Sequence, residues 1–215
     1  MKPYYEHAGI TIYHGDCREI LPNIQKVDLV LTDPPYGMNF QSNHRIKKHT
    51  KIVNDDRFPV EDVFKLIDHA TRAAYIFCRW DNIADVMNGL PKPKSILVWV
   101  KNNWSMGDLD HEHGRQWEAI CFWPREGHQF IKRIPDVINA DRTANNDHPT
   151  EKPSGLLQLI LEANVGQTVL DPFMGSGTTL RAAKDLRRRA IGIEIEEKYC
   201  EIAAKRLQQE VFNFE

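Results

Sequence analysis

Short apolar runs recur along the chain and alternate with amphipathic stretches. The runs cover residues 10–13, 27–31, 74–78, 96–100, 119–123, 168–170 and 190–195. Their length and their β-branched and aromatic content predict buried strands. Apolar side chains with helical spacing fall within residues 60–71, 156–163 and 196–209. Strands that alternate with helices predict an α/β fold built on a doubly wound, mostly parallel sheet.

The chain has the size and composition of a single folded domain. Its 215 residues are 41% hydrophobic and 27% charged, and no low-complexity tract or flexible linker divides them. We therefore expect one domain, residues 1–215. Residues 38–57, which are polar and basic, and residues 126–146, which lack clear periodicity, interrupt the pattern. We interpret both segments as candidate functional loops that contact DNA if the protein binds it.

Charge and hydropathy exclude some classes of protein. The formal net charge is −2, so any contact with nucleic acid must depend on local basic patches. The apolar runs are far shorter than the roughly 20 residues that span a bilayer, and the first residues lack an apolar signal core. The four cysteines, at positions 17, 78, 121 and 200, form no C-x-x-C pair. These features predict a cytoplasmic protein with reduced, mostly buried thiols and no membrane partner.

A glycine-rich turn follows the apolar run at 168–170. The turn runs from Asp171 to Gly177, with the sequence DPFMGSG, and a helical stretch begins near Thr178. Gly175 and Gly177 allow the backbone to approach a ligand closely, and the helix N-terminus offers N–H groups. Glu194 ends the next strand, where an acid can accept the hydroxyl hydrogens of a ribose. Together these features predict a site for a nucleoside cofactor.

The same turn favours S-adenosylmethionine over a dinucleotide. A dinucleotide fingerprint requires a third glycine, but Thr179 and Leu180 follow Gly177 instead. The Asp171 carboxylate would repel a pyrophosphate and attract the ammonium group of an amino-acid moiety. S-adenosylmethionine has that ammonium group and no phosphate.

A second motif, Asp33-Pro34-Pro35-Tyr36, follows the run at 27–31. The two prolines would hold the Asp33 carboxylate and a proline carbonyl as paired acceptors, and the Tyr36 ring offers a face for a base. The exocyclic amine of adenine or cytosine is a poor nucleophile, because its lone pair is delocalised into the ring. Two fixed acceptors would restore lone-pair character as a methyl group arrives. All four residues are candidate catalytic residues, and a stiff strand-ending turn is the simpler alternative for the tetrapeptide alone.

These motifs resemble those of the β-type, permuted amino-group DNA methyltransferases that use S-adenosylmethionine. Residues 33–36 are similar to the family's D/N/S-P-P-Y/F/W motif, and residues 173–177 are similar to its F-x-G-x-G motif. The resemblance implies a Rossmann-like, seven-stranded sheet in circularly permuted order, S-adenosylhomocysteine as product and a possible homodimer. Residues 15–17 look like the adenine-contacting turn, and residues 148–153 look like the segment that closes the methionine end. The implied cofactor-binding residues are Asp16, Cys17, Lys152, Asp171, Phe173, Gly175, Ser176, Gly177, Thr178 and Glu194.

The order of the motifs narrows the substrate that the resemblance implies. The catalytic motif precedes the cofactor motif, as in permuted DNA methyltransferases. Asp33 resembles adenine-N6 members more than cytosine-N4 members, and no Pro-Cys pair offers the thiol nucleophile of a cytosine-C5 enzyme. We expect methylation of adenine N6 in double-stranded DNA, with the base flipped out of the helix, in a restriction-modification context. Cytosine-N4 methylation and a non-catalytic nucleic-acid-binding module are the alternatives.

The remaining charged residues receive simpler interpretations. Arg45, Lys47, Lys48 and Lys51 follow the catalytic motif, where phosphates flanking a flipped base would lie, with a solvated charge run as the alternative. The three arginines at 187–189 are interpreted as contributing to solubility. The acidic and histidine residues within 108–113 match no common metal site, and methyl transfer of this kind requires no metal. Core packing explains Trp99, and Lys101 receives no role.

Overall fold

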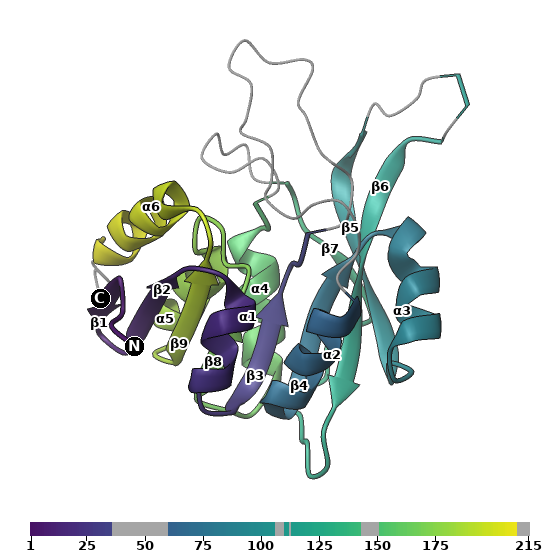
Figure 1. Ribbon diagram of the computed structural model, residues 1–215. Coiled ribbons are helices and arrows are strands. Elements are labelled where there is room, and N and C mark those ends of the chain that lie inside the picture. The colour runs from purple at the N-terminus through teal and green to yellow at the C-terminus, as the bar shows by residue number, and fades with distance from the viewer. Residues whose placement is uncertain (36–59, 106–109, 112, 143–150, 210–215) are drawn as a thin grey trace.

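The computed structural model describes residues 1–35, 60–105, 110–111, 113–142 and 151–209, and its elements form three layers (Figure 1). The central layer is a nine-stranded sheet in the order β1-β2-β9-β8-β3-β4-β6-β5-β7. Its strands are β1 Tyr5–His7, β2 Ile10–His14, β3 Val27–Thr32, β4 Ala70–Cys78, β5 Ser95–Ser105, β6 Arg115–Pro124, β7 Val137–Asn139, β8 Thr168–Asp171 and β9 Arg189–Glu194. Helices cover both faces of the sheet, so the α/β class expected from the sequence is confirmed.

The sheet is mostly parallel. Five adjacent strands, β2, β9, β8, β3 and β4, pair in parallel, and β5 pairs in parallel with β7. β6 lies antiparallel between β4 and β5, and β1 pairs antiparallel with β2. The seven apolar runs form β2 to β6, β8 and β9, while the short edge strands β1 and β7 add to this expected set. A seven-stranded, mostly parallel core is therefore confirmed.

Three helices pack on each face of the sheet. On one face lie α1 Cys17–Ile20, α2 Val60–His69 and α3 Ile83–Gly89, whose apolar side chains share one buried cluster. On the other face lie α4 Ser154–Ala163, α5 Thr178–Asp185 and α6 Glu197–Gln208, which share the second cluster. The short 3-10 turns η1 Leu21–Asn23 and η2 Trp80–Asn82 connect to α1 and α3. Burial of two apolar faces of one sheet is the main stabilising contribution to this architecture.

The three helices expected from the sequence differ slightly in their bounds from the expectation, and the helix expected over 156–163 begins at Ser154. The helix expected over 60–71 ends at His69, because Ala70 already pairs with Val27 and begins β4. The Thr71 hydroxyl donates a hydrogen bond to the Val27 carbonyl oxygen at 3.0 Å, which fixes this residue to the sheet. The last helix runs over Glu197–Gln208, inside the expected 196–209, with Glu196 and Gln209 as its caps.

The order of the strands is permuted relative to their order in the chain. β2 and β3 are consecutive strands in the sequence, but β9 and β8 lie between them in the sheet. β3 therefore pairs with β8, with Leu29 opposite Val169 and Val30 opposite Leu170. This pairing brings the segment after residue 32 next to the segment after residue 171.

Among the helices that the structure describes, none combines the length and the apolar content needed to cross a bilayer. All four cysteines are buried free thiols, as the sequence predicts. Cys78 on β4 and Cys121 on β6 lie closest to each other, with their sulfur atoms 3.7 Å apart.

Candidate active site

Three strands end in polar residues at the same edge of the sheet. β3 ends at Thr32, β8 at Asp171 and β9 at Glu194, and these strands run in parallel. Since the carboxyl ends of parallel strands meet at one edge, both sequence motifs lie there. In Figure 1 this edge is the upper end of β3, β8 and β9.

A buried hydrogen bond joins the two motifs. The Thr32 hydroxyl donates to Asp171 Oδ1 at 2.6 Å, and the Phe173 N–H donates to the same oxygen at 3.2 Å. Asp171 is only 4% exposed. Burial raises the pKa of Asp171 to about 6, although the side-chain hydrogen bonds from Thr179 and Thr32 oppose this effect. Near neutral pH, Asp171 is therefore a carboxylate that a cationic ligand group would stabilise.

The glycine-rich turn adopts the backbone that its sequence predicts. Gly175 and Gly177 have φ values of +51° and +79°, in the left-handed region that favours glycine. A Cβ atom at Gly177 would lie 2.8 Å from the Ala203 Cβ on α6. The Met174 N–H donates to the Ile193 carbonyl at 3.1 Å, which ties the turn to β9. The turn is thus both conformationally and sterically restricted.

Glu194 lies directly against this turn. Its carboxylate accepts hydrogen bonds from the Gly175 N–H at 3.0 Å and from the Glu196 N–H at 2.8 Å. Burial raises the pKa of Glu194, and these backbone hydrogen bonds oppose the increase. A carboxylate offers about four acceptor positions, so the hydroxyl groups of a ligand can occupy the others.

Other side chains in and next to the turn interact with neighbouring parts of the chain. The Ser176 hydroxyl lies 3.3 Å from Glu151 Oε2, and Arg206 Nη1 donates to Thr178 Oγ1 at 2.9 Å. Arg206 also pairs with Glu151 at 3.1 Å. Phe173 is partly buried against the cluster under α1 to α3. These contacts connect the turn to α6 and to the segment before α4.

The turn before α1 also reaches this edge, because the Gly15 N–H donates to the Glu194 carbonyl at 2.9 Å. Asp16 caps α1 by accepting the Arg18 N–H at 2.9 Å, and it also pairs with the Arg18 guanidinium. The hydrogen bond from the Arg18 side chain is the main cause of a lowered Asp16 pKa. Cys17 is buried, and burial raises the pKa of its thiol to about 12. Asp16 and Cys17 therefore directly follow the residue that contacts Glu194. The Asp16 side chain is paired with Arg18, and the Cys17 side chain is buried in the cluster under α1 to α3.

The catalytic motif begins in the described part of the chain. Asp33 is partly exposed, Pro34 is buried and Pro35 is partly buried. The Lys152 ammonium contacts Asp33 Oδ2 directly and lies 3.3 Å from Glu118 Oε2. The structure thus brings Lys152 to the catalytic turn.

Sequence reasoning missed Glu118 and gave no role to Lys101. Glu118 lies on β6, where Lys101 of the adjacent β5 reaches its Oε1 at 2.5 Å. The sequence offered one signal for a role of Glu118, which is that a charged residue lies directly before the apolar run 119–123. A carboxylate at such a position requires a partner, which sequence spacing alone does not identify.

Several predicted DNA-contact residues fall outside the described residues. These are Arg45, Lys47, Lys48 and Lys51, together with Tyr36, the loop 38–57 and residues 143–146.

The described part of segment 126–146 passes from one edge of the sheet to the other. Phe130 bridges to Asn164, at the edge opposite Asp33. Only the end of the segment returns to the carboxyl edge, where Trp99 Nε1 donates to the Ala140 carbonyl at 2.8 Å. The first part of this segment therefore does not lie beside the catalytic turn.

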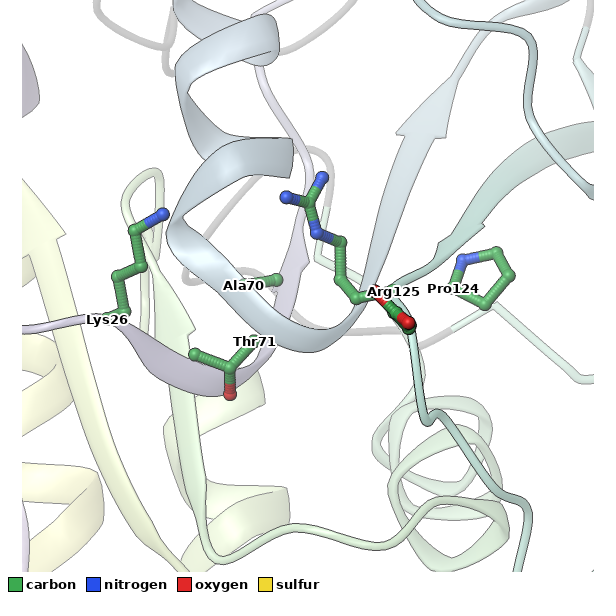
Figure 2. A pocket seen from close by; sticks show the side chains of 6 residues that line it. Lys26, Ala70, Thr71, Pro124 and Arg125 are labelled. Atoms are coloured by element: carbon green, nitrogen blue, oxygen red, sulfur yellow. The ribbon is translucent and has the colours of Figure 1, made fainter.

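A cavity of about 490 Å³ lies at the opposite edge from the motifs (Figure 2). Its lining residues are Lys26, Ala70, Thr71, Pro124, Arg125 and Glu126. β4 begins at Ala70 and the antiparallel β6 ends at Pro124, so this is the amino edge of the parallel strands. The cavity is therefore distinct from the candidate active site.

Comparisons with known proteins agree with this arrangement. A family model described as DNA methylase, of the N6/N4 methyltransferase type, matches residues 98–205. The type II methyltransferase M2.DpnII of Streptococcus pneumoniae is 29% identical over 254 aligned positions, covering 97% of this chain and 93% of the relative. The crystal structure of an M1.HpyAVI–SAM complex is 28% identical with a TM-score of 0.68, covering 92% of this chain and 99% of that one. The cytosine-N4-specific PvuII DNA methyltransferase shares the fold at 15% identity and a TM-score of 0.73, covering 99% and 91%.

Proposed function

The chain belongs to the N6/N4 DNA methylase family, and on that premise we propose that it methylates the N6 amino group of adenine in double-stranded DNA. The methyl donor in this proposal is S-adenosylmethionine. Asp33 before the two prolines favours adenine N6 over cytosine N4. Similarity to the type II methyltransferase M2.DpnII favours a restriction-modification context.

The hydrogen bond between Thr32 and Asp171 carries the proposal. Its 2.6 Å length joins β3 to β8 at the edge where both motifs begin. Thr32 directly precedes Asp33, and Asp171 is the first residue of the glycine-rich turn. The acceptor for an amine and the turn for a cofactor are therefore neighbours. Direct transfer of a group between two bound molecules requires this proximity.

The residues around the glycine-rich turn fit S-adenosylmethionine. The buried Asp171 carboxylate suits an ammonium group, and Glu194 beside Gly175 suits the two hydroxyls of a ribose. Asp16, directly after the residue that contacts Glu194, is our candidate acceptor for the adenine amine of the cofactor. When bound, S-adenosylmethionine supplies an electrophilic methyl group on a sulfonium. The SAM complex of M1.HpyAVI, at 28% identity, supports the same cofactor here.

The catalytic turn would activate the target amine without a covalent enzyme intermediate. The Asp33 carboxylate and the Pro34 carbonyl each accept an N–H bond of the amine, which turns its lone pair out of the plane of the base. Because Pro34 is buried and both prolines restrict the backbone, these acceptors need little reorganisation during the reaction. The proton released after transfer leaves through Asp33 to solvent, which its partial exposure permits.

The base must leave the duplex to reach this turn. We propose that Tyr36 stacks on the flipped base, and that Arg45, Lys47, Lys48 and Lys51 contact the flanking phosphates. These assignments follow from their positions in the sequence after Asp33.

The proposal is tested by mass spectrometry of nucleosides from plasmid DNA. The plasmid is grown in methylation-deficient cells that express the wild-type protein, Asp33→Ala or Asp185→Ala. Asp185 is the matched control, because it lies at the far end of α5 and pairs with Arg181. We expect N6-methyladenine with the wild type and with the control, and at least a 100-fold reduction with Asp33→Ala.

Each other outcome has a defined meaning. N4-methylcytosine would move the target to cytosine while keeping the site. Undiminished methylation by a folded Asp33→Ala variant would refute the proposed catalytic turn. No modified base with the wild-type protein would refute the proposed activity on DNA.

A further inference from the structure

Four charged side chains form a row of alternating sign beside the catalytic turn. Lys101 contacts Glu118, Glu118 lies near Lys152, and Lys152 contacts Asp33. The Nζ–O distances are 2.5 Å from Lys101 to Glu118 Oε1 and 3.3 Å from Lys152 to Glu118 Oε2. The row links β5, β6, the segment before α4 and the turn after β3.

Three members of this row, Lys101, Glu118 and Lys152, are shielded from water. The side chains of Lys152 and Glu118 are 7% and 16% exposed, and that of Lys101 is 12% exposed. The Phe77 ring lies 5.1 Å below the Lys152 ammonium, and the Trp99 ring lies at the same distance from Lys101. A buried charge is costly unless it is paired, so each member depends on its neighbours.

The row creates a competition at Asp33. Lys152 contacts an oxygen of the carboxylate that, in the proposed function, accepts the target amine. A lysine ammonium has three donors, and Glu118 Oε2, 3.3 Å from this ammonium, attracts it as well. The position of the ammonium between two carboxylates therefore determines how strongly Asp33 is engaged before the base arrives.

We propose that Glu118 is a positioning residue for methyl transfer: it shares the Lys152 ammonium with Asp33, so that Asp33 keeps a counter-ion while its carboxylate can still accept an N–H of the amine. This inference rests on the proposed function of Asp33. Lys101 sets the strength of the effect, because it competes with Lys152 for the same Glu118 carboxylate. Glu118 acts through Lys152 and does not contact the substrate.

The electrostatics of the row supports this role. Burial alone would raise the pKa of Glu118, but the Lys152 and Lys101 charges outweigh burial and lower it to about 2. Burial would lower the pKa of Lys152, but Asp33 and Glu118 outweigh burial and raise it. Burial lowers the pKa of Lys101, which Glu118 opposes.

The surroundings of the row contain further titratable groups. Arg142 acts on Lys101, and the Cys78 thiol on β4 faces both Asp33 and Glu118. Neutralising Glu118 removes one of the two carboxylates that keep Lys152 protonated, so the pKa of Lys152 must fall. Removing Lys101 takes away a nearby positive charge, so the pKa of Lys152 must rise.

The test measures single-turnover methyl transfer by the full chain between pH 6 and 11, because the pKa of Lys152 is raised above its ordinary value. Cofactor affinity is measured by calorimetry. Glu118→Gln should reduce the rate at least tenfold with cofactor affinity unchanged within twofold. It should also move the alkaline loss of activity to lower pH. Glu118→Asp should recover part of the rate. Asp185→Asn, which removes a carboxylate paired with Arg181 on α5, is the matched control and should behave as wild type.

A second variant separates positioning from folding. Lys101→Gln should move the alkaline loss of activity to higher pH, which is the opposite direction from Glu118→Gln. A purely structural role would lower activity without opposite pH shifts. Circular dichroism and thermal melting show whether Glu118→Gln folds. If it does not fold, the pH profile of Lys101→Gln alone tests the inference.

The following outcomes overturn the inference. They are an unchanged rate and pH profile in a folded Glu118→Gln variant, an unchanged alkaline limb in Lys101→Gln, or a loss confined to cofactor affinity. If wild type is active and Asp33→Ala is inactive, such results refute only the role of Glu118. If Asp33→Ala remains active, the proposed function fails first, and the role of Glu118 fails with it.

Discussion

Asp171 combines a stability cost with a binding function. Its pKa is about 6 in the folded protein and 3.8 in an ordinary aspartate, so ionising it after folding costs about 3 kcal/mol more. This cost is absent below pH 3.8, grows between pH 3.8 and 6, and is fully present above pH 6. Residues that bind ligands commonly carry such a cost.

Asp171→Asn should therefore reduce cofactor affinity at least tenfold without lowering the melting temperature of the ligand-free protein at pH 7.5. For the wild type, affinity should fall as pH decreases through about 6, because protonation removes the charge that attracts the ammonium group. The Asn variant should lose this pH dependence. Calorimetric titration with S-adenosylmethionine between pH 5 and 7.5 and thermal melting measure both effects. A wild-type affinity that stays constant over this range would refute the role of Asp171.

Single residues also mark where sequence reasoning reached its limit. The motif residues Asp33, Asp171 and Glu194 were identified because each lies within two residues of the end of an apolar run. Glu118 was missed because its partners, Lys101 and Lys152, become its neighbours only in the folded chain: Lys101 through the pairing of β5 with β6, and Lys152 through the position of the segment before α4. The solubility interpretation of the arginine run is wrong for Arg188, which is 9% exposed and donates to the Asn164 carbonyl at 2.8 Å. Its flanking residues gave no signal of this burial.

At the scale of elements, the glycine-rich turn and α6 constrain each other. Gly177 has a φ of +79°, and a side chain there would meet Ala203 at 2.8 Å. The left-handed backbone alone costs a non-glycine residue about 1–2 kcal/mol. The steric contact adds to this cost, because Ala203 is fully buried on α6.

We expect Gly177→Ala to lower the free energy of unfolding by about 2–4 kcal/mol and to weaken cofactor binding. Ala203→Gly relieves the contact but not the backbone strain. The free energy of unfolding of the double variant should therefore be about 1 kcal/mol higher than the sum of the two single effects predicts. Gly155→Ala is the control, because a Cβ there meets nothing within 4 Å in α4, and it should not destabilise. Urea unfolding of the wild type, the two single variants, the double variant and the Gly155→Ala control measures these differences. Strict additivity would mean that the contact with Ala203 is not strained.

Elements were predicted best where their hydrophobic pattern was long and regular. The apolar runs identified β3, β6 and β9 because buried parallel or central strands need continuous apolar sequence. α1 and α3, with four and seven residues, were missed because they are too short for a helical period to be visible. β5 extends to Ser105 through polar residues 101–103, where its register with β6 is irregular before Ser105 pairs with Arg115. Tertiary pairing therefore extends strands beyond what local sequence indicates.

At the scale of the whole molecule, charge limits how DNA can bind. The net charge of −2, from 28 basic and 30 acidic residues, gives no general attraction for a polyanion. Binding must therefore depend on a local concentration of lysine and arginine. Our candidate for this basic patch is the segment after the catalytic motif that contains Arg45, Lys47, Lys48 and Lys51.

Replacing these four residues with alanine should reduce the salt dependence of DNA affinity. Each phosphate contact contributes about −0.9 to the slope of log affinity against log salt concentration, so the loss of four contacts reduces the magnitude of the slope by about 3.6. The matched control replaces Lys92 and Lys94, which are exposed before β5 at the amino edge of the sheet. Fluorescence anisotropy at several salt concentrations measures both slopes. Equal slopes for the wild type and the four-residue variant would place the phosphate contacts elsewhere.

The strand order has a consequence for how the chain is made. A ribosome releases β1 to β7 before β8 and β9, yet β9 and β8 fill the gap between β2 and β3. Until residue 194 has been made, β2 and β3 lack the strands β9 and β8 with which they pair in the folded sheet. The last two strands fill this gap and bring Asp171 to Thr32. The complete sheet and the contact between the two motifs can therefore form only once β8 and β9 have been made.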